Sequence, residues 1–336
     1  MKRWQFWLGL AISAVFLALV LRGLDLAAFW VEVGQANYWW LLPGVGVYFI
    51  GVVVRAWRWQ FLLRPLKRVP LASSWRLTAI GYMGNNIYPA RAGELLRAAL
   101  LKRNEGVAIS ASLATIIVER IFDGVVMLGF IFLNLGELAR LTGGAGIAGG
   151  LSIQQIALWG TLIFIGALAI FLLGAMFPAQ SEGLLALAGR VLPDALRERF
   201  MGLARAFLEG LASLRSPVEA LMVFATSVLI WLLETGKYWF VMQAFDFEVS
   251  FFALMLMNGV VNLATTIPSA PGYVGTFDAP GIAVLEAYGV PGAIATSYTF
   301  VLHVALWLPI TLLGAYYLAK EGLKVGELPQ EAKARA

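Results

Sequence analysis

The chain has 336 residues, 60% of them hydrophobic and 13% charged, and it contains no cysteine, which excludes disulfides, thiol chemistry and cysteine metal sites. Six apolar runs are long enough to span a bilayer, which excludes a soluble globular protein because such a fold would have to bury them all. The net charge of +5 is gathered in a few loops, so it indicates contact with anionic lipid headgroups and no partnership with nucleic acid.

The hydropathy pattern predicts an all-α polytopic membrane protein with six full spans and two interrupted hydrophobic segments. The full spans are expected, in chain order, at about 5–21, 38–56, 107–135, 153–178, 217–243 and 291–319. The interrupted segments cover about 73–101 and 251–287, and each contains a stretch with proline and glycine. Irregular backbone at membrane depth must be covered by protein or reached by water, so we interpret both segments as re-entrant pairs of half-helices. The alternatives are a plain helical hairpin or one kinked span.

The loops carry the positive charge that orients the spans. Lysines and arginines follow the second span, follow the first interrupted segment, and fill the central loop and the tail. These residues are Arg58, Arg64, Lys67, Arg68, Lys102, Arg103, Arg190, Arg197, Arg199, Arg205, Arg215, Lys320, Lys324, Lys333 and Arg335. With six full spans and two re-entrant segments, all of them fall on the side of Lys2 and Arg3. The positive-inside rule makes that side cytoplasmic, so both termini are expected in the cytoplasm.

This topology divides a single transmembrane domain, 1–336, into two inverted halves, 38–135 and 217–319. Each half contains a span, a re-entrant segment and a second span, in opposite orientations. Inverted halves suit alternating access, because each half can open to its own side of the membrane. Between them, hydrophobic residues recur at steps of three and four, which predicts a cytoplasmic amphipathic connector at 182–215. Residues 320–336 are expected to form a short polar cytoplasmic tail.

The first interruption reads Asn-Asn-Ile-Tyr-Pro-Ala-Arg-Ala-Gly-Glu at 85–94 and places two charges inside an apolar segment. A helix is expected to begin again near Gly93, and a helix N-terminus offers free N–H groups and the positive end of the helix dipole. Together with the guanidinium of Arg91, this predicts a phosphate-binding site in a wet cavity. Asn85 and Asn86 either line that site or satisfy backbone groups that the break leaves free.

Ionisable residues at bilayer depth cost roughly 2.5–3.5 kcal/mol each on insertion scales, so they need partners or a wet cavity. Three opposite-charge pairs are spaced as neighbours on a helix: Glu94 with Arg97, Arg120 with Asp123, and Glu234 with Lys237. Arg91, Glu119, Asp278 and His303 complete the set at this depth. These residues either hold helices together or form a functional site, and the spacing alone leaves both readings open.

The single histidine, His303, lies in the last predicted span. A histidine side chain titrates near neutral pH, so His303 is a candidate for proton coupling, together with Glu234 and Lys237. The alternative is a packed and hydrogen-bonded histidine without that role.

Several short motifs lie between residues 55 and 123. They are Arg-Ala-Trp-Arg-Trp at 55–59, Gly-Asn-Asn at 84–86, Pro-Ala-Arg-Ala-Gly-Glu at 89–94 followed by Arg97, and Glu-Arg at 119–120 followed by Asp123. This stretch resembles the flippase-like, or lysylphosphatidylglycerol synthase transmembrane, family, which includes the membrane half of the multiple peptide resistance factor. The motif Pro-Gly-Tyr-Val-Gly-Thr-Phe-Asp at 271–278 is similar to the family's second signature, PGGxGxxE. Here Tyr273 stands in place of a glycine and Asp278 in place of a glutamate.

The resemblance covers nearly the whole chain and implies a prokaryotic plasma-membrane protein that moves lipids between leaflets, and a homodimer. Phospholipids, aminoacylated phospholipids and polyprenyl-linked lipids are the substrates that it implies. No segment of the chain resembles the soluble domain that aminoacylates phosphatidylglycerol. Synthase activity is therefore not expected, and neither is any other enzyme activity.

The leading hypothesis is a lipid flippase that binds a phosphate headgroup and needs no cofactor. The candidate substrate-binding residues are Arg91, Gly93, Glu94, Arg97, Asn85, Asn86, Glu119, Arg120, Asp123 and Asp278. The arginines would neutralise the phosphate, and the carboxylates would position the arginines or engage a cationic headgroup. One alternative is a membrane-embedded enzyme acting on lipid-linked substrates, with Glu119 and Asp123 as acid and base. Another is a proton-coupled transporter of a small solute, which would need a laterally sealed cavity, whereas a lipid needs a side opening.

Overall fold

The computed structural model describes residues 11–16, 18, 25–88, 91–134, 153–190, 193–267 and 269–322. Regular structure within these residues is entirely helical, which confirms the predicted all-α class. Most of the predicted first span and the tail from residue 323 lie outside the described residues.

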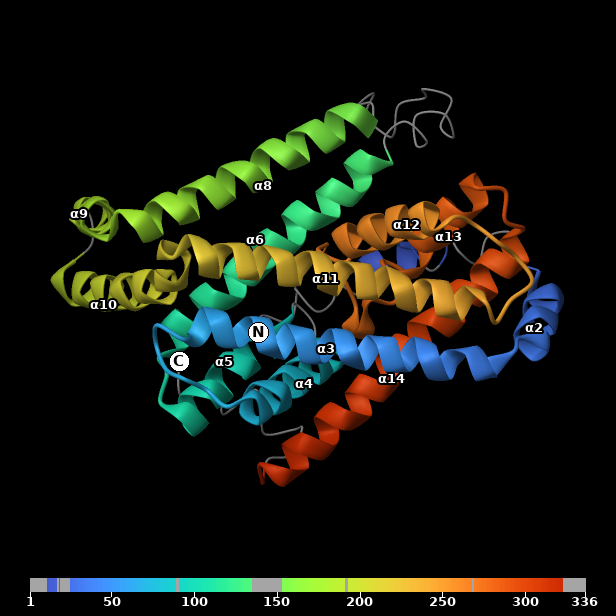
Figure 1. The fold of residues 1–336 in the computed structure, drawn as a ribbon, viewed down its shortest axis with the longest axis horizontal. Coiled ribbons are helices and arrows are strands. Elements are labelled where there is room, and N and C mark those ends of the chain that lie inside the picture. The colour runs from blue at the N-terminus through green and yellow to red at the C-terminus, as the bar shows by residue number, and fades with distance from the viewer. Residues whose placement is uncertain are drawn as a thin grey trace.

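Three helices of the described chain are long and apolar enough to cross a membrane, and a bent pair forms a fourth candidate. They are α3 (Leu41–Leu63, with the short helix η1, Tyr38–Trp40, before it), α11 (Pro217–Met242) and α14 (Gly292–Lys320). The bent pair joins the end of α8 (Ile153–Met176) to α9 (Pro178–Gly189) at 106°. Figure 1 shows α3 and α11 side by side along the length of the molecule. The chain is thus a polytopic membrane protein.

The second predicted span ends too early. It was expected to stop at 56, and Arg58 was therefore counted among the cytoplasmic loop charges. In the structure α3 continues to Leu63, and Arg58 is fully buried within it. The helix continues because partners on other helices neutralise its arginines. Helix α6 (Ile109–Leu133) fits the predicted span 107–135 and carries three ionisable residues.

Each interrupted segment forms two helices packed against one another, which rules out a single kinked span. The first comprises α4 (Leu71–Ile87) and α5 (Ala92–Glu105). The second comprises α12 (Phe251–Ala264), the short helix η3 (Pro271–Tyr273) and α13 (Asp278–Ala287). In Figure 1 the hairpin α4–α5 lies nearer the end of the molecule that carries α10 (Asp194–Gly210), and α12–α13 lies nearer the end that carries α2 (Leu26–Gln35).

Glycines allow the first hairpin to close tightly. A Cβ on Gly93 would lie 1.9 Å from the carbonyl oxygen of Gly81, and a Cβ on Gly84 would lie 2.7 Å from the Cα of Gly93. A Cβ on Gly314 of α14 would likewise lie 2.5 Å from the carbonyl oxygen of Ala79. Small residues at contacts between helices are typical of membrane proteins, where close backbone approach replaces hydrophobic driving force.

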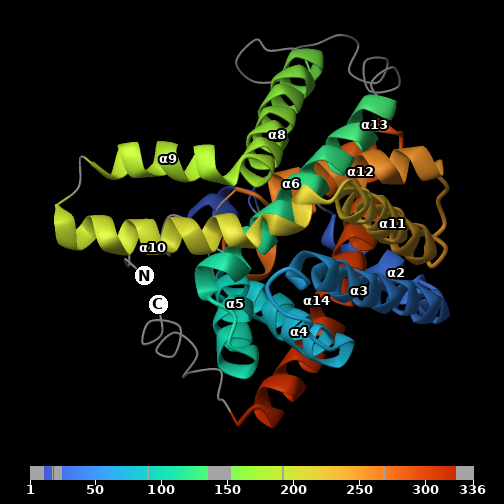
Figure 2. The ribbon, with the colours of Figure 1, turned by 60° about the vertical axis from the view of Figure 1, so that its left-hand side comes forward.

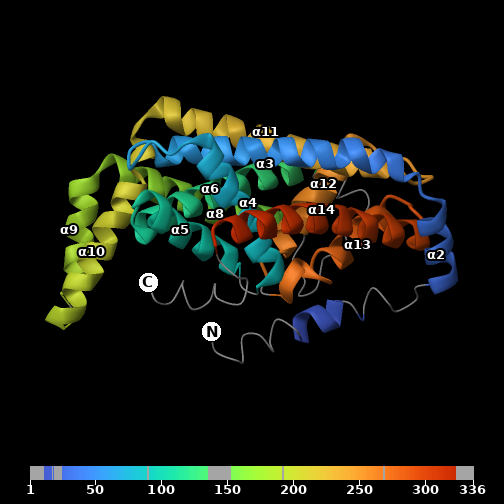
Figure 3. The ribbon, with the colours of Figure 1, turned by 90° about the horizontal axis from the view of Figure 1, so that it is seen from below.

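The predicted connector 182–215 is more than one helix. It contains the end of α9, the whole of α10 and the short helix η2 (Ala212–Arg215). Figure 2 shows α9 and α10 lying side by side. In Figure 3 they form one end of the molecule, and α2 lies at the opposite end.

Candidate functional site

Two arginines of α3 join three helices in the interior. Arg58 donates hydrogen bonds to Asp123 Oδ1 on α6 at 2.5 Å and to Ser227 Oγ on α11 at 2.7 Å. Arg55, one turn earlier, donates to Glu234 Oε1 on α11 at 3.1 Å. Neither arginine was among the predicted site residues. Their three-residue spacing in an otherwise apolar helix was the available signal, because it places both on one face.

Two of the three predicted pairs are formed. Arg120 Nη2 lies 3.3 Å from Asp123 Oδ2, and the ammonium of Lys237 contacts the carboxylate of Glu234 directly. Asp123 also accepts a hydrogen bond from the indole of Trp231 at 3.0 Å. A buried carboxylate with several donors is compensated for the water it has lost.

The predicted pair between Glu94 and Arg97 is wrong. Arg97 is buried and reaches from α5 to Glu119 on α6, where Nη2 and Oε2 are 2.5 Å apart. Glu94 instead faces Arg91 at 3.8 Å and Arg120 at 3.7 Å. The contact between α5 and α6 offered Arg97 a better-placed carboxylate than its neighbour on the same helix.

Cations outnumber carboxylates in this network. Its six cationic side chains are Arg55, Arg58, Arg91, Arg97, Arg120 and Lys237. Its four carboxylates, within the part of the chain that the structure describes, are Glu94, Glu119, Asp123 and Glu234. Two positive charges therefore remain uncompensated, and in surroundings of low dielectric constant they favour an anion strongly.

A polar cavity of about 140 Å³ opens beside this network, between the two hairpins. Its charged lining consists of Arg55, Arg91, Arg120, Lys237 and Glu234, so it shows four cations and one carboxylate. Arg120 Nε is buried and makes no hydrogen bond to a described residue. It lies 3.7 Å from Glu94 Oε1, a carboxylate that does not line the cavity.

The first interruption contributes the polar lining from α4. Asn85 and Asn86 both line the polar cavity, and Asn86 also donates a hydrogen bond of 2.8 Å to Thr311 Oγ1 on α14. Arg91 directly precedes α5 and has φ 52° and ψ 37°, in the left-handed region that few residues other than glycine occupy. Its guanidinium donates to the carbonyl oxygen of Thr265 at 3.3 Å, so Arg91 links the two interrupted segments.

The other predicted residues near the first interruption lie away from the cavity. Gly93, Glu94, Arg97, Glu119 and Asp123 do not line it. Gly93 packs against α4, Arg97 pairs with Glu119, and Glu94 and Asp123 face Arg120, which does line the cavity. The sequence could not separate these positions, because hydropathy and spacing do not show which side of a helix meets a cavity.

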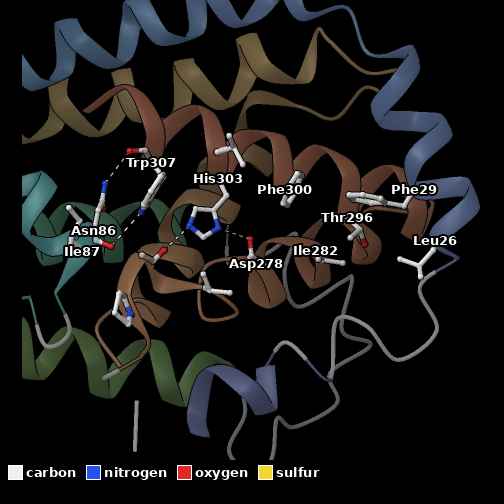
Figure 4. Close-up of a pocket in the computed structure, with 14 residues that line it drawn as sticks. Leu26, Phe29, Asn86, Ile87, Asp278, Ile282, Thr296, Phe300, His303 and Trp307 are labelled. Atoms are coloured by element: carbon white, nitrogen blue, oxygen red, sulfur yellow. Dashed lines mark hydrogen bonds and ion pairs between the residues drawn. The ribbon is translucent and has the colours of Figure 1, made fainter. Parts of the chain in front are cut away.

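The second interruption forms hydrogen bonds with His303 of α14. His303 Nδ1 lies 2.8 Å from Asp278 Oδ1, and Nε2 lies 2.7 Å from the carbonyl oxygen of Gly272. The other carboxylate oxygen of Asp278 accepts the backbone N–H of Gly275 at 2.8 Å. In Figure 4 the ring of His303 points from α14 toward Asp278. Asp278 is thus a partner of His303 and does not line the polar cavity.

A larger apolar cavity of about 620 Å³ adjoins the polar one. Figure 4 shows its lining, which includes Leu26, Phe29, Ile87, Ile282, Phe300 and Trp307. Asn86, Gly272, His303 and Trp307 line both cavities, so they form the wall between them. Phe300 and Val304 of this lining have exposed side chains.

Comparison with known proteins places this chain among membrane proteins. Residues 6–314 match the family described as Lysylphosphatidylglycerol synthase TM region. A UPF0104 membrane protein of Methanothermobacter thermautotrophicus is 25% identical over 293 residues, which are 83% of each chain. Another UPF0104 membrane protein, of Methanocaldococcus jannaschii, is 22% identical over 241 residues, 71% of this chain and 95% of the relative. No solved structure gives a significant match.

A further relative overturns one expectation. Glycosyltransferase AglD of Haloferax volcanii is 26% identical over 332 residues, which are 91% of this chain and 52% of the relative. The expectation that the chain is not an enzyme rested on the lack of a segment resembling a soluble synthase domain. A match to a protein named as an enzyme contradicts it, although this chain spans only about half of that relative.

Proposed function

The chain belongs to the lysylphosphatidylglycerol synthase transmembrane family, and from that premise we propose that it moves a lipid with a phosphate headgroup between the leaflets of a prokaryotic plasma membrane. The observation that carries the proposal is the pair of adjoining cavities, one small and positively lined, the other larger and apolar. A membrane lipid has the same division, with a charged headgroup joined to an apolar tail.

The headgroup site is the polar cavity. Arg91, which directly precedes α5, and Arg120 of α6 both line it. Their planar guanidinium groups can donate paired hydrogen bonds to phosphate oxygens. Arg55 and Lys237 add charge from α3 and α11. Replacing the hydration shell of a phosphate by these donors lowers the barrier that the bilayer interior presents to it.

The tail stays in apolar surroundings throughout. The apolar cavity meets the polar one at the wall formed by Asn86, Gly272, His303 and Trp307, and its lining includes the exposed side chains of Phe300 and Val304. In the proposed movement the tail enters between these two side chains, a route that a water-soluble solute would not need.

Alternating access would come from the two halves, 38–135 and 217–319. We propose six full spans and two re-entrant hairpins in an inverted arrangement, with both termini in the cytoplasm. Two observations support it: both interruptions are hairpins, and Arg91 of the first contacts the backbone of Thr265 in the second. Each half can then open the shared site to its own side of the membrane.

A second candidate function is favoured by the glycosyltransferase relative. In it, the same two cavities hold a lipid-linked phosphate for glycosyl transfer. The two functions share the headgroup site and differ in whether the lipid is chemically altered.

Reconstitution in proteoliposomes tests the proposal. Headgroup-labelled phosphatidylglycerol, lysyl-phosphatidylglycerol and undecaprenyl phosphate are assayed in separate runs, and leaflet exchange is followed with an impermeant quencher. We expect exchange of at least one lipid, its loss in Arg91→Ala, and its retention in Arg205→Ala, whose guanidinium is exposed on α10 and pairs with Glu182. Absence of exchange for every lipid, both with and without a proton gradient, would refute lipid movement. Altered products among the extracted lipids would establish the second function.

A further inference from the structure

The contacts of His303 require a proton between its ring and the carboxyl group of Asp278. The carbonyl oxygen of Gly272 can only accept, so Nε2 carries a hydrogen. Nδ1 and the Asp278 carboxylate oxygen are 2.8 Å apart, and two lone pairs at that distance would repel one another. A second proton therefore lies between them, on the ring or on the carboxyl group. With it the pair is neutral, and without it the pair carries one negative charge.

This pair sits where the two cavities meet. His303 and Gly272 line both cavities, whereas Asp278 lines only the apolar one. The ring of Phe277 packs on His303 with centroids 4.5 Å apart, and the side chains of His303 and Asp278 are only 14% and 15% exposed. Proton loss would thus place a negative charge beside an apolar surface.

Other charged groups face His303 across the polar cavity. They are Arg55 on α3, Arg91 before α5, Arg120 on α6, and Glu234 and Lys237 on α11. The tyrosines that line the same cavity are Tyr48, Tyr82 and Tyr273. On the apolar side, Asp278 is the one acidic or basic partner of His303 among the described lining residues.

The backbone that His303 holds has an unusual conformation. Gly272 and Tyr273 have φ of 74° and 61°, and Gly275 has φ 82°. The two hydrogen bonds of His303 and the contact from Asp278 to the Gly275 N–H fix this segment against α14. Loss of the shared proton would turn one of these contacts repulsive, so the wall between the cavities would loosen.

We propose that His303 and Asp278 form a proton-binding site that couples lipid movement to a proton gradient. The proton lies between Nδ1 and Oδ1 while the wall is closed and leaves to water in the polar cavity when the wall opens. This coupling rests on the proposed lipid movement, whereas the proton-binding site itself does not.

Nuclear magnetic resonance can observe the site directly, because His303 is the only histidine in the chain. The full protein, purified with a histidine-free tag and labelled with ring-¹⁵N histidine, is titrated in lipid nanodiscs from about pH 5 to about pH 10. We expect the ring signals to report one proton gained or lost, and Asp278→Asn to displace that titration. Glu286→Gln, which removes an exposed carboxylate from the same helix, should leave it in place. Ring signals that stay constant, or that ignore Asp278→Asn, would overturn the site.

The coupling is tested in proteoliposomes that contain a pH-sensitive dye. We expect lipid exchange to respond to an imposed proton gradient and to be accompanied by proton flux, and both the response and the flux to be lost in His303→Gln. Glutamine can still donate to the Gly272 carbonyl, but it cannot take up a proton. Lipid exchange without proton flux in the unsubstituted protein would overturn the coupling and leave the proposed function intact. No lipid exchange under any gradient, together with a normal histidine titration, would refute the proposed function and keep the proton site.

Discussion

The guanidinium of Arg58 and the carboxylate of Asp123 meet at two points, with Nη1–Oδ1 and Nη2–Oδ2 distances of 2.5 and 3.3 Å. Arg58 is completely buried, and Asp123 is almost completely so. Asp123 in turn faces Arg55 and Arg120, both of which line the polar cavity. The buried pair thus anchors the carboxylate that positions two of the cavity's cations.

Removing one partner of this pair should destabilise the protein severely. Arg58→Met leaves Asp123 without its main donor, and breaking a buried pair in this way typically costs about 3–5 kcal/mol. Chemical unfolding in detergent measures the change. Arg205→Met, at an exposed pair, serves as the control and should cost at most about 1 kcal/mol. Equal effects of the two substitutions would contradict the anchoring role of Arg58.

Adding one methyl group to Gly93 should separate α4 from α5. Its Cβ would lie 1.9 Å from the Gly81 carbonyl oxygen, so the helices must move, at a cost of about 1–3 kcal/mol or more. Gly129→Ala in α6 is the matched control, because no atom lies within 4 Å of that position. The control should gain up to about 1 kcal/mol from the helix propensity of alanine. Thermal unfolding of both variants measures these changes in stability. A Gly93→Ala protein as stable as the unsubstituted one would refute the close packing of α4 and α5.

Two substitutions at the polar cavity should act in opposite directions on anion affinity. Arg120→Gln removes a charged donor worth about 1.5–3 kcal/mol, so binding should weaken about tenfold to a hundredfold. Glu234→Gln removes the single carboxylate in the described lining and should tighten binding. Calorimetric titration with glycerol phosphate, a soluble headgroup, measures both. Weaker anion binding in both variants would contradict the prediction. It would show that Glu234 matters more for holding the cations in place than for repelling the anion.

Filling the apolar cavity should impair binding of the lipid tail without affecting binding of the headgroup. Val304→Trp adds bulk to its lining and is expected to slow lipid exchange severalfold while glycerol phosphate binds as before. Leu312→Trp, exposed on the same helix and outside both cavities, should exchange lipid normally. If Val304→Trp exchanged lipid at the original rate, the tail would have to follow another path.

The sequence predicted helices better than it predicted contacts between them. Hydropathy located α6, α11 and α14 within a few residues, and helical spacing found the pairs Arg120–Asp123 and Glu234–Lys237. Spacing failed for Arg97, because its partner Glu119 belongs to another helix. Arg58 was missed for the same reason, since an arginine near the end of an apolar run looks like a loop residue until its buried partner is known.

For the two interrupted segments, the sequence predicted the positions of the breaks but not all of the contacts made there. Proline and glycine marked both of them correctly, and Arg91 and Asn85 do line the polar cavity. The partnership of His303 with Asp278 spans 25 residues and two helices, and no local pattern encodes it. Residues at such tertiary contacts were therefore recognised as ionisable residues in the membrane but not assigned to partners.

The left-handed backbone conformation of Arg91 lowers stability at a position where the proposed function needs the arginine side chain. A non-glycine residue in this region costs roughly 1–2 kcal/mol, and glycine would occupy it without that penalty. Arg91→Gly should therefore relax the turn before α5 and at the same time empty the polar cavity of one guanidinium. Selection for stability alone would favour glycine here, whereas an anion needs the arginine. We therefore expect Arg91→Gly to give a more stable protein that no longer binds its ligand.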